Sequence, residues 1–260
     1  MAGTSHPLFQ AICERPWDTS LRLAYADWLE KNGQPRWAAF IRVQCQNPDW
    51  TLDHFQALCS INKDRGEFDP FESDWLKELP KLPGVWWGTS FERGFINHVT
   101  FHSAKAFQEH AATVFVAAPI DMIAIERLTD ETVRDILSSL FLRRLQWFAL
   151  YSTGRLTDKG MHLLAACPNL TYLKNLSIDS SGCGDEGAEA LAGSPYLGKL
   201  QRLFLENHRI GDRGALALAR SPNLSNVTFF VFRKWKRLSQ SVVAELKKRF
   251  QWLDGWPTQD

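Results

Sequence analysis

Three nearby histidines are the first side chains whose type suggests chemistry, because histidine is the commonest metal ligand. They are His98, His102 and His110. His98 and His102 fall four residues apart on one expected strand, which separates them by about 13 Å at ~3.3 Å per residue. Zinc-bound nitrogens lie about 2 Å from the ion, so these two side chains would not reach one ion on a regular strand. We therefore predict no metal site and no cofactor.

Nucleophilic cysteines are the second candidates, and the chain has five cysteines at scattered positions. A catalytic cysteine needs an electropositive setting and an oriented base. Cys183 instead lies beside Asp185 and Glu186, whose charges would raise its pKa. The sequence also lacks a Gly-x-Ser-x-Gly elbow, a phosphate-binding glycine loop followed by lysine, and a His-Glu-x-x-His motif. We therefore predict that the protein is not an enzyme and has no small-molecule substrate.

One strongly basic segment stands out in a sequence whose formal net charge is only +1. It consists of Arg233, Lys234, Trp235, Lys236 and Arg237, an aromatic ring with two cations on each side. This pattern suits a nucleic-acid backbone with one stacked base, or an acidic protein surface. It is also compatible with a solvated cap at the end of a fold, and the three interpretations stay open.

Carboxylates recur in a regular row at Asp158, Asp185 and Asp212, each in a Gly-Asp-x-Gly or similar turn. Such a row could hold calcium ions. An aspartate just before a helix more simply caps that helix, once per repeat, by accepting a hydrogen bond from a backbone N–H. We expect each aspartate to cap the helix that it precedes.

Asp27 and Trp28 could form a recognition pair near the N-terminus. The alternative is that Tyr25 and Trp28 pack between helices while Asp27 makes a local cap or salt bridge. We expect the second arrangement.

The aspartate row belongs to a repeat with a period of 27 residues. Two independent markers keep this period, namely Pro168, Pro195 and Pro222, and Gly160, Gly187 and Gly214. After each proline an apolar triplet with L-x-x-L-x-L spacing ends in the alternation of a strand, and a helical stretch follows the turn. Two weaker upstream units, at spacings of 24 and 25, bring the total to about six strands. A solenoid needs at least about three repeats to bury a continuous core.

Residues 94–260 resemble the ribonuclease-inhibitor-like class of leucine-rich repeats. The resemblance implies an α/β leucine-rich-repeat solenoid with parallel strands inside and helices outside. The chain departs from the pattern at the position that usually carries asparagine, which holds Thr153, Ser181, His208 and Trp235. The last unit is therefore expected to be a divergent cap.

The first 45 residues are expected to be helical, with Asp18 as the N-cap of a second helix and Gly33 as its stop. The segments Leu23-Ala-Tyr-Ala-Asp-Trp-Leu-Glu and Phe40-Ile-Arg-Val-Gln resemble the bacterial repeat-companion domain that precedes leucine-rich repeats. Similar proteins continue with an Arg-Gly-Phe strand, here Arg93-Gly94-Phe95. The family carries no established activity that would transfer to this chain.

These patterns predict a small all-helical domain followed by the repeats. The expected boundaries are 1–45 for the helical repeat-companion domain, 46–93 for a helical connector and N-terminal cap with a helix from Leu52 to Asp64, and 94–260 for the leucine-rich-repeat domain with its C-terminal cap.

In such a solenoid, the strand residues that alternate with the core face the concave surface. Several of them are aromatic, a type that is enriched at binding hot spots. The predicted partner-binding residues are Trp147, Tyr151, Asp179, Arg202, Phe204, Glu206, Phe229 and Arg233. We predict a non-enzymatic adaptor or regulatory subunit that binds a protein there. The alternatives are a nucleic-acid-binding accessory subunit that uses the basic segment, and rings covered by the chain's own tail, Trp252 to Trp256.

The start of the sequence shows no leader pattern, and no window approaches the roughly 18 apolar residues of a membrane helix. An odd number of scattered cysteines fits reduced thiols. We expect a cytoplasmic protein with no membrane partner.

Overall fold

The computed structural model describes residues 5–47, 77–88, 91–151, 156–179, 182–206, 208–232 and 237–250. Its strands are β1 (Val85–Trp87), β2 (Phe91–Glu92), β3 (Phe95–Ile96), β4 (His98–Phe101), β5 (Met122–Glu126), β6 (Trp147–Tyr151), β7 (Asn175–Asp179), β8 (Arg202–Glu206) and β9 (Phe229–Phe232). Its α-helices are α1 (Pro7–Glu14), α2 (Thr19–Lys31), α3 (Pro35–Gln46), α6 (Ala104–Ala117), α7 (Asp130–Leu137), α8 (Asp158–Ala165), α9 (Asp185–Ala192), α10 (Asp212–Arg220) and α11 (Gln240–Arg249). Two short 3-10 helices are η3 (Leu140–Arg144) and η4 (Pro168–Leu170).

The described elements form a mixed α/β fold whose strands do not close into a barrel. Seven strands form one sheet in the order β1-β4-β5-β6-β7-β8-β9, and β2 and β3 form a separate antiparallel pair. The pairs from β5 to β9 are all parallel. Among the described residues, no helix has both the length and the apolar character needed to cross a membrane.

The chain divides into two compact units. The N-terminal unit consists of Met1–Val99 with Glu109–Asp121, and the repeat unit of Thr100–Gln108 with Met122–Asp260. The predicted helix from Leu52 to Asp64 lies outside the described residues.

Helix α2 of the N-terminal unit begins and ends at its sequence signals. The Asp18 carboxylate accepts hydrogen bonds from the N–H groups of Ser20 and Leu21, at 3.0 and 3.2 Å, and so caps α2. Gly33 follows α2 with a φ of 81°, a left-handed conformation that glycine adopts without strain. Both features confirm the predicted helix boundaries.

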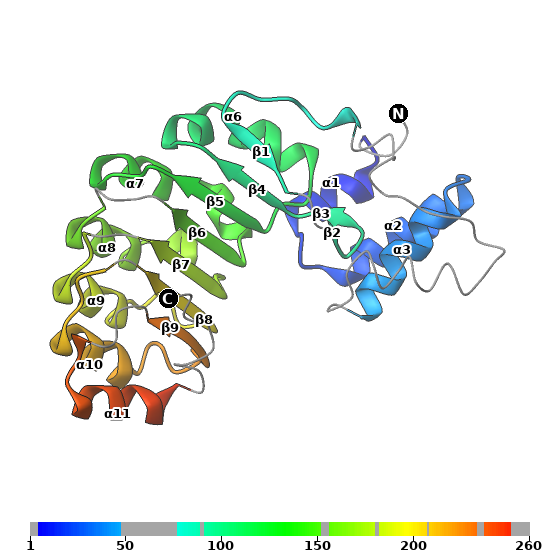
Figure 1. The fold of residues 1–260 in the computed structure, drawn as a ribbon. Helices are drawn as coiled ribbons and strands as arrows, with labels where there is room; N and C mark the ends of the chain where they lie inside the picture. Colours follow the sequence, from blue (N-terminus) through cyan, green and yellow to red (C-terminus); the bar gives the residue numbers. More distant parts are fainter. Residues whose placement is uncertain are drawn as a thin grey trace, which may run out of the picture. The chain divides into compact units, whose positions relative to one another are not determined.

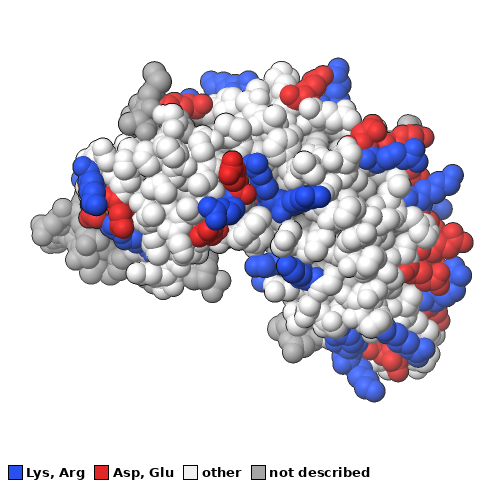
Figure 2. Space-filling view, turned by 180° about the vertical axis from the view of Figure 1, so that it is seen from behind, with Lys and Arg blue, Asp and Glu red and all other residues white. Residues whose placement is uncertain are grey.

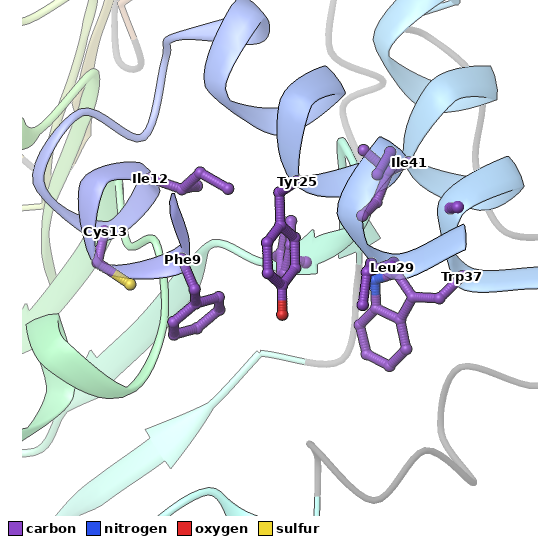
Figure 3. Close-up of a cluster of buried hydrophobic side chains, with 10 residues drawn as sticks. Phe9, Ile12, Cys13, Tyr25, Leu29, Trp37 and Ile41 are labelled. Carbon is purple, nitrogen blue, oxygen red and sulfur yellow. The ribbon is translucent and has the colours of Figure 1, made fainter. Parts of the chain in front are cut away.

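The core of this unit gathers apolar side chains from α1, α2 and α3 (Figure 3). Tyr25 is buried in it and stacks on Trp28, with ring centroids 5.6 Å apart. Asp27 accepts a hydrogen bond from Arg42 on α3 at 2.6 Å. The expected arrangement, rings packed between helices and a local salt bridge at Asp27, is therefore confirmed.

The prediction that Arg93-Gly94-Phe95 forms one strand is wrong. Arg93 and Gly94 form the turn of the β2–β3 hairpin, and only Phe95 belongs to a strand. Arg93 and Gly94 have φ values of 50° and 89°, the positive angles that a tight two-residue hairpin turn requires. The Gly94 N–H donates to Gln44 Oε1 at 2.6 Å, and a Cβ on Gly94 would lie 2.2 Å from Ile41 Cγ1. Only glycine therefore fits between the turn and α3.

A buried ionic cluster lies under this turn. Arg22 is fully buried and donates to Pro16 O at 2.6 and 3.1 Å and to Arg93 O at 2.9 Å. The Arg93 guanidinium contacts the buried carboxylate of Asp121 at 3.1 Å, and Asn97 donates to the other oxygen of Asp121 at 2.8 Å. Burial lowers the pKa of Arg22 to about 10 and raises the pKa of Asp121 to about 6.

In the repeat unit, each strand from β5 to β8 is followed by a helix. These strand–helix repeats stack side by side (Figure 1). The register places equivalent positions opposite each other, with Trp147 beside Asn175, Asn175 beside Arg202, and Arg202 beside Phe229. Apolar side chains of the predicted triplets are buried between strands and helices, as the alternation predicted. The five strands from β5 to β9 thus confirm the expected parallel strands.

The predicted caps exist, but each aspartate caps the helix of the following repeat rather than its own. Asp158 Oδ1 accepts from the N–H groups of Gly184 and Gly187, at 2.6 and 2.9 Å, in the first turn of α9. Its own helix, α8, is capped by the Thr157 hydroxyl, which accepts from Lys159 N. An aspartate at the first helical position lies past the N-cap, so its carboxylate bonds to the adjacent helix start.

The same bond recurs along the unit, and we call the set the aspartate ladder. Its members are Asp130, which accepts from Thr157 and Gly160, Asp158, which accepts from Gly184 and Gly187, Asp185, which accepts from Gly211 and Gly214, and Asp212, which accepts from Ser239. Two N–H donors converge on one oxygen in each of the first three. These contacts explain the regular row of carboxylates as structural caps.

The ladder also explains why glycine recurs in the turn. A Cβ on Gly187 would lie 2.5 Å from Asp158 Oδ1, and a Cβ on Gly214 would lie 2.7 Å from Asp185 Oδ1. A side chain at either position would therefore push the capping carboxylate away.

A second ladder runs at the other end of the helices, through the residue before each marker proline. Ser194 donates to Ala165 O at 2.6 Å, and Ser221 donates to Ala192 O at 2.5 Å. Cys167 occupies the equivalent place and contacts Leu137 O at 3.4 Å. Each repeat thus satisfies a carbonyl at the end of the preceding helix.

Candidate functional site

The candidate site is the face of strands β5 to β9 that is opposite the helices. Helices α7 to α11 lie on one side of these strands (Figure 1), and the described residues of the repeat unit place no helix on the other side. We call the second side the helix-free face. It corresponds to the surface on which the sequence predicted partner binding.

Three aromatic rings from different strands meet on this face. Trp147 of β6 stacks on Phe204 of β8, with centroids 5.9 Å apart and an interplanar angle of 14°. Phe204 in turn contacts Phe229 of β9 at 5.4 Å. We call these three residues the ring cluster. Because strands β6 and β8 are about 10 Å apart, the first two rings must lean toward each other over β7.

The residues in the middle of the helix-free face are less exposed to solvent than the alternating pattern predicted. Ala124, Ala149 and Ser177 point to this side by their register, yet all three are buried. They are small, and larger side chains on the same face flank them. The ring cluster consequently stands over a floor of small residues.

The remaining predicted contact residues lie at the two ends of the strands. Tyr151 is exposed at the C-terminal end of β6, and Asp179 pairs in register with Glu206 at the ends of β7 and β8. Arg202 is exposed at the N-terminal end of β8. Arg233 lies outside the described residues, so its place on this face is not described.

The sequence did not predict a histidine–carboxylate pair that joins His102, just after β4, to Glu126 at the end of β5. His102 Nδ1 lies 2.8 Å from Glu126 Oε2, with both side chains about a quarter exposed. The two residues are 24 apart, which is the spacing of the upstream repeats, so the period held the signal.

The proposed single strand for His98 and His102 is not observed, since β4 ends at Phe101. His98 is partly buried, which lowers its pKa, and His110 lies 3.9 Å from Glu109. In the described part of the chain, no group of three or more histidine, cysteine or acidic side chains could hold a metal ion.

The Cys183 thiol has the raised pKa that the sequence predicted, but burial is the largest cause, and of the two predicted carboxylates only Asp185 contributes. Burial, followed by the charges of Asp158 and Asp185, raises the pKa of its thiol to about 12. A thiol with such a pKa carries almost no thiolate at neutral pH and is a poor nucleophile.

The predicted basic segment is described only at its last residue, Arg237, which is exposed. Arg233, Lys234, Trp235 and Lys236 lie outside the described residues, as does the tail from Trp252 to Trp256. Of the four positions where leucine-rich repeats carry asparagine, only His208 is described. It is buried, and its Nδ1 accepts from Ile210 N at 3.2 Å, so it stabilises its own loop.

Comparison with known proteins adds no relative to this picture. No protein-family model matches the chain, and no curated protein matches it in sequence.

Proposed function

We propose that this chain is a leucine-rich-repeat protein of the α/β solenoid type, preceded by a helical N-terminal segment, that binds a protein partner on its helix-free face. The 27-residue period, the parallel strands and the two ladders support the repeat assignment. In repeat proteins, each unit contacts mainly its neighbours, which leaves one long sheet surface available for a partner.

The ring cluster is the observation that carries the binding proposal. Trp147, Phe204 and Phe229 are only partly buried, and they come together from three strands. Tryptophan is enriched among the residues that dominate binding energy, and aromatic residues including phenylalanine are enriched at the cores of protein interfaces. Charged residues at both ends of the strands, such as Arg202 and Glu206, supply the polar rim that surrounds such centres.

Nothing in this proposal needs catalysis. The protein acts as an adaptor or regulatory subunit, and its specificity comes from the residues that surround the ring cluster. The thiol of Cys183 is buried and has a raised pKa, to which two carboxylates of the aspartate ladder contribute, which fits a structural role.

The test is affinity capture from native lysate with the purified chain as bait, in wild-type and variant forms. The variant Trp147→Ala with Phe204→Ala removes the centre of the ring cluster, and Tyr151→Ala truncates an exposed side chain without touching the core. Leu140→Ala is the matched control, because Leu140 is exposed on η3, outside the helix-free face.

A stoichiometric protein that wild type and control retain, and that both face variants lose or weaken, supports the proposal. Circular dichroism checks that the double variant is folded. Capture that is equal for all four proteins contradicts it.

A further inference from the structure

The four segments that lead from α7, α8, α9 and α10 to the next strand carry only one sign of charge. In residues 138–147, 166–175, 193–202 and 220–229 the sequence contains no aspartate or glutamate, although the whole chain has 29 acidic residues. The same segments hold six cations. We call this surface the basic edge, and its cations are Arg143, Arg144, Lys174, Lys199, Arg202 and Arg220.

The rest of the repeat unit does not share this separation. Along the outer surface of α7 to α11, basic and acidic side chains alternate (Figure 2), as in the ion pair of Arg213 with Glu189 at 3.3 Å. Charges of both signs there largely cancel at a distance. The basic edge therefore concentrates positive potential in a chain whose net charge is +1.

The cations of the basic edge belong to segments of neighbouring repeats, and these segments lie side by side. Lys174 N donates to Gln146 O at 2.9 Å, and Arg202 N donates to Lys174 O at 3.0 Å, so consecutive segments are one strand spacing apart. That spacing is about 4.8 Å. The repeat thus places cations that are far apart in the sequence on adjacent backbone segments.

The structure leaves most of these charges available. Arg143, Lys174, Lys199, Arg202 and Arg220 are exposed, and none of the five forms an ion pair with a described residue. Favourable interaction with a helix C-terminus accounts for a cation in the last turn, such as Arg220 on α10. Lys174 and Arg202 lie at the starts of strands, where that explanation does not apply.

Aromatic rings are interleaved with the cations. The Lys199 ammonium lies 4.2 Å from the ring centre of Tyr172, which is 49% exposed, and the Arg144 guanidinium lies 5.4 Å from the ring centre of Phe141. A double-stranded nucleic acid would present phosphates alone to this surface. A single strand presents phosphates for the cations and unpaired bases for the rings.

We propose that the basic edge binds single-stranded nucleic acid through phosphate contacts to Lys174, Lys199 and Arg202, with a base stacked on Tyr172. This surface lies at the N-terminal ends of the strands and is distinct from the sequence-predicted segment at 233–237. It does not depend on the protein-binding proposal, except that Arg202 borders both surfaces.

The test is fluorescence anisotropy of the full chain with a fluorescein-labelled oligothymidine or oligouridine of about twelve nucleotides. Three phosphate contacts predict a log–log salt slope near −2, which is a loss of affinity of about 20-fold between 50 and 200 mM salt. The variant Lys174→Gln, Lys199→Gln, Arg202→Gln should lose at least about tenfold in affinity at 50 mM salt and most of the salt slope. All three side chains are exposed, so the fold should persist.

The matched control makes the same charge change on other exposed surfaces of the repeat unit. Arg127→Gln, Lys159→Gln, Arg209→Gln should keep the affinity within about twofold, because these residues lie outside the basic edge. Equal losses in the two triple variants would show attraction to net charge alone and overturn the proposal.

Two further measurements distinguish a nucleic-acid ligand from an acidic protein ligand. One uses the variant Tyr172→Ala, and the other uses a labelled polyglutamate peptide in place of the oligonucleotide. Loss of stacking should weaken oligonucleotide binding roughly fivefold or more, and the peptide should bind more weakly than the oligonucleotide at equal salt. The assignment would be contradicted if the oligonucleotide showed no salt-dependent binding. It would also be contradicted if the peptide bound with equal affinity and that affinity did not change in Tyr172→Ala.

Discussion

The two units of this protein satisfy their buried polar groups in opposite ways. The N-terminal unit uses one irregular cluster, in which Arg22, Arg93 and Asp121 meet from distant parts of the sequence. The repeat unit uses short bonds that recur once per repeat, such as that of Asp158 with Gly187. A single cluster concentrates a large free energy in a few residues, whereas the ladders spread it over many equivalent positions.

The comparison predicts its largest effect at Arg22. Replacement by methionine leaves the buried carbonyls of Pro16 and Arg93 without donors and removes a positive charge near Asp121. The free energy of unfolding should fall by about 3–5 kcal/mol, as for breaking a buried ionic contact. Urea unfolding measures it, with Arg22→Lys as an intermediate case that keeps the charge. A loss below about 1 kcal/mol would mean that the cluster is not concentrated at Arg22.

The second effect is a pH dependence of the free energy of unfolding that comes from Asp121 in the buried ionic cluster of the N-terminal unit. Burial raises the pKa of Asp121 from 3.8 to about 6, so the folded state binds more protons than the unfolded state between these values. The free energy of unfolding should therefore decrease by about 2–3 kcal/mol as pH rises from about 4 to about 6, through this group alone. The contribution is the difference between wild type and Asp121→Asn in urea unfolding at each pH. A difference that stays constant across this window would contradict it.

The third prediction concerns one rung of the aspartate ladder. Asp158→Ala removes two charge-assisted hydrogen bonds and should cost about 2 kcal/mol. Hydrogen exchange should become faster at the amides of Gly184 and Gly187 in the first turn of α9, while the first turn of α8 stays protected. Asp135→Ala, at an exposed aspartate outside the ladder, is the control. Exposure of α8 instead would place the cap within its own repeat.

The smallest effect is expected in the second ladder. Ser194→Ala removes a buried hydrogen bond to Ala165 O and should cost about 1 kcal/mol. Thr171→Ala, which removes an exposed bond to Pro168 O, should change the free energy of unfolding by less than about 0.5 kcal/mol. Equal effects of the two changes in thermal unfolding would remove the distinction between ladder and surface bonds.

The periodic parts of the fold were visible in the sequence for a physical reason. Each strand must bury the same positions against the same helix face, so residues such as Leu176, Leu203 and Phe230 recur 27 apart. The identity of the capped helix was not visible. A sequence shows that an aspartate lies at a helix start, whereas the geometry of adjacent repeats decides which N–H groups it meets.

The irregular parts gave no such signal. Nothing in the sequence pairs Arg22 with Arg93 or Asp121, because the contact occurs once and joins residues about 70 to 100 positions apart. Positive φ at Arg93 was equally hidden, since arginine seldom adopts it. The sequence alternation placed the aromatic residues on one sheet face, but the closeness of Trp147 to Phe204 across β7 depends on side-chain rotamers.

The direction of the aspartate ladder bears on how the chain is made. Each cap comes from the repeat that the ribosome has already released, since Asp130 serves α8, Asp158 serves α9 and Asp185 serves α10. Each capping carboxylate is therefore synthesised before the N–H groups that it binds, an order that would let the repeats stack in turn from the N-terminal side.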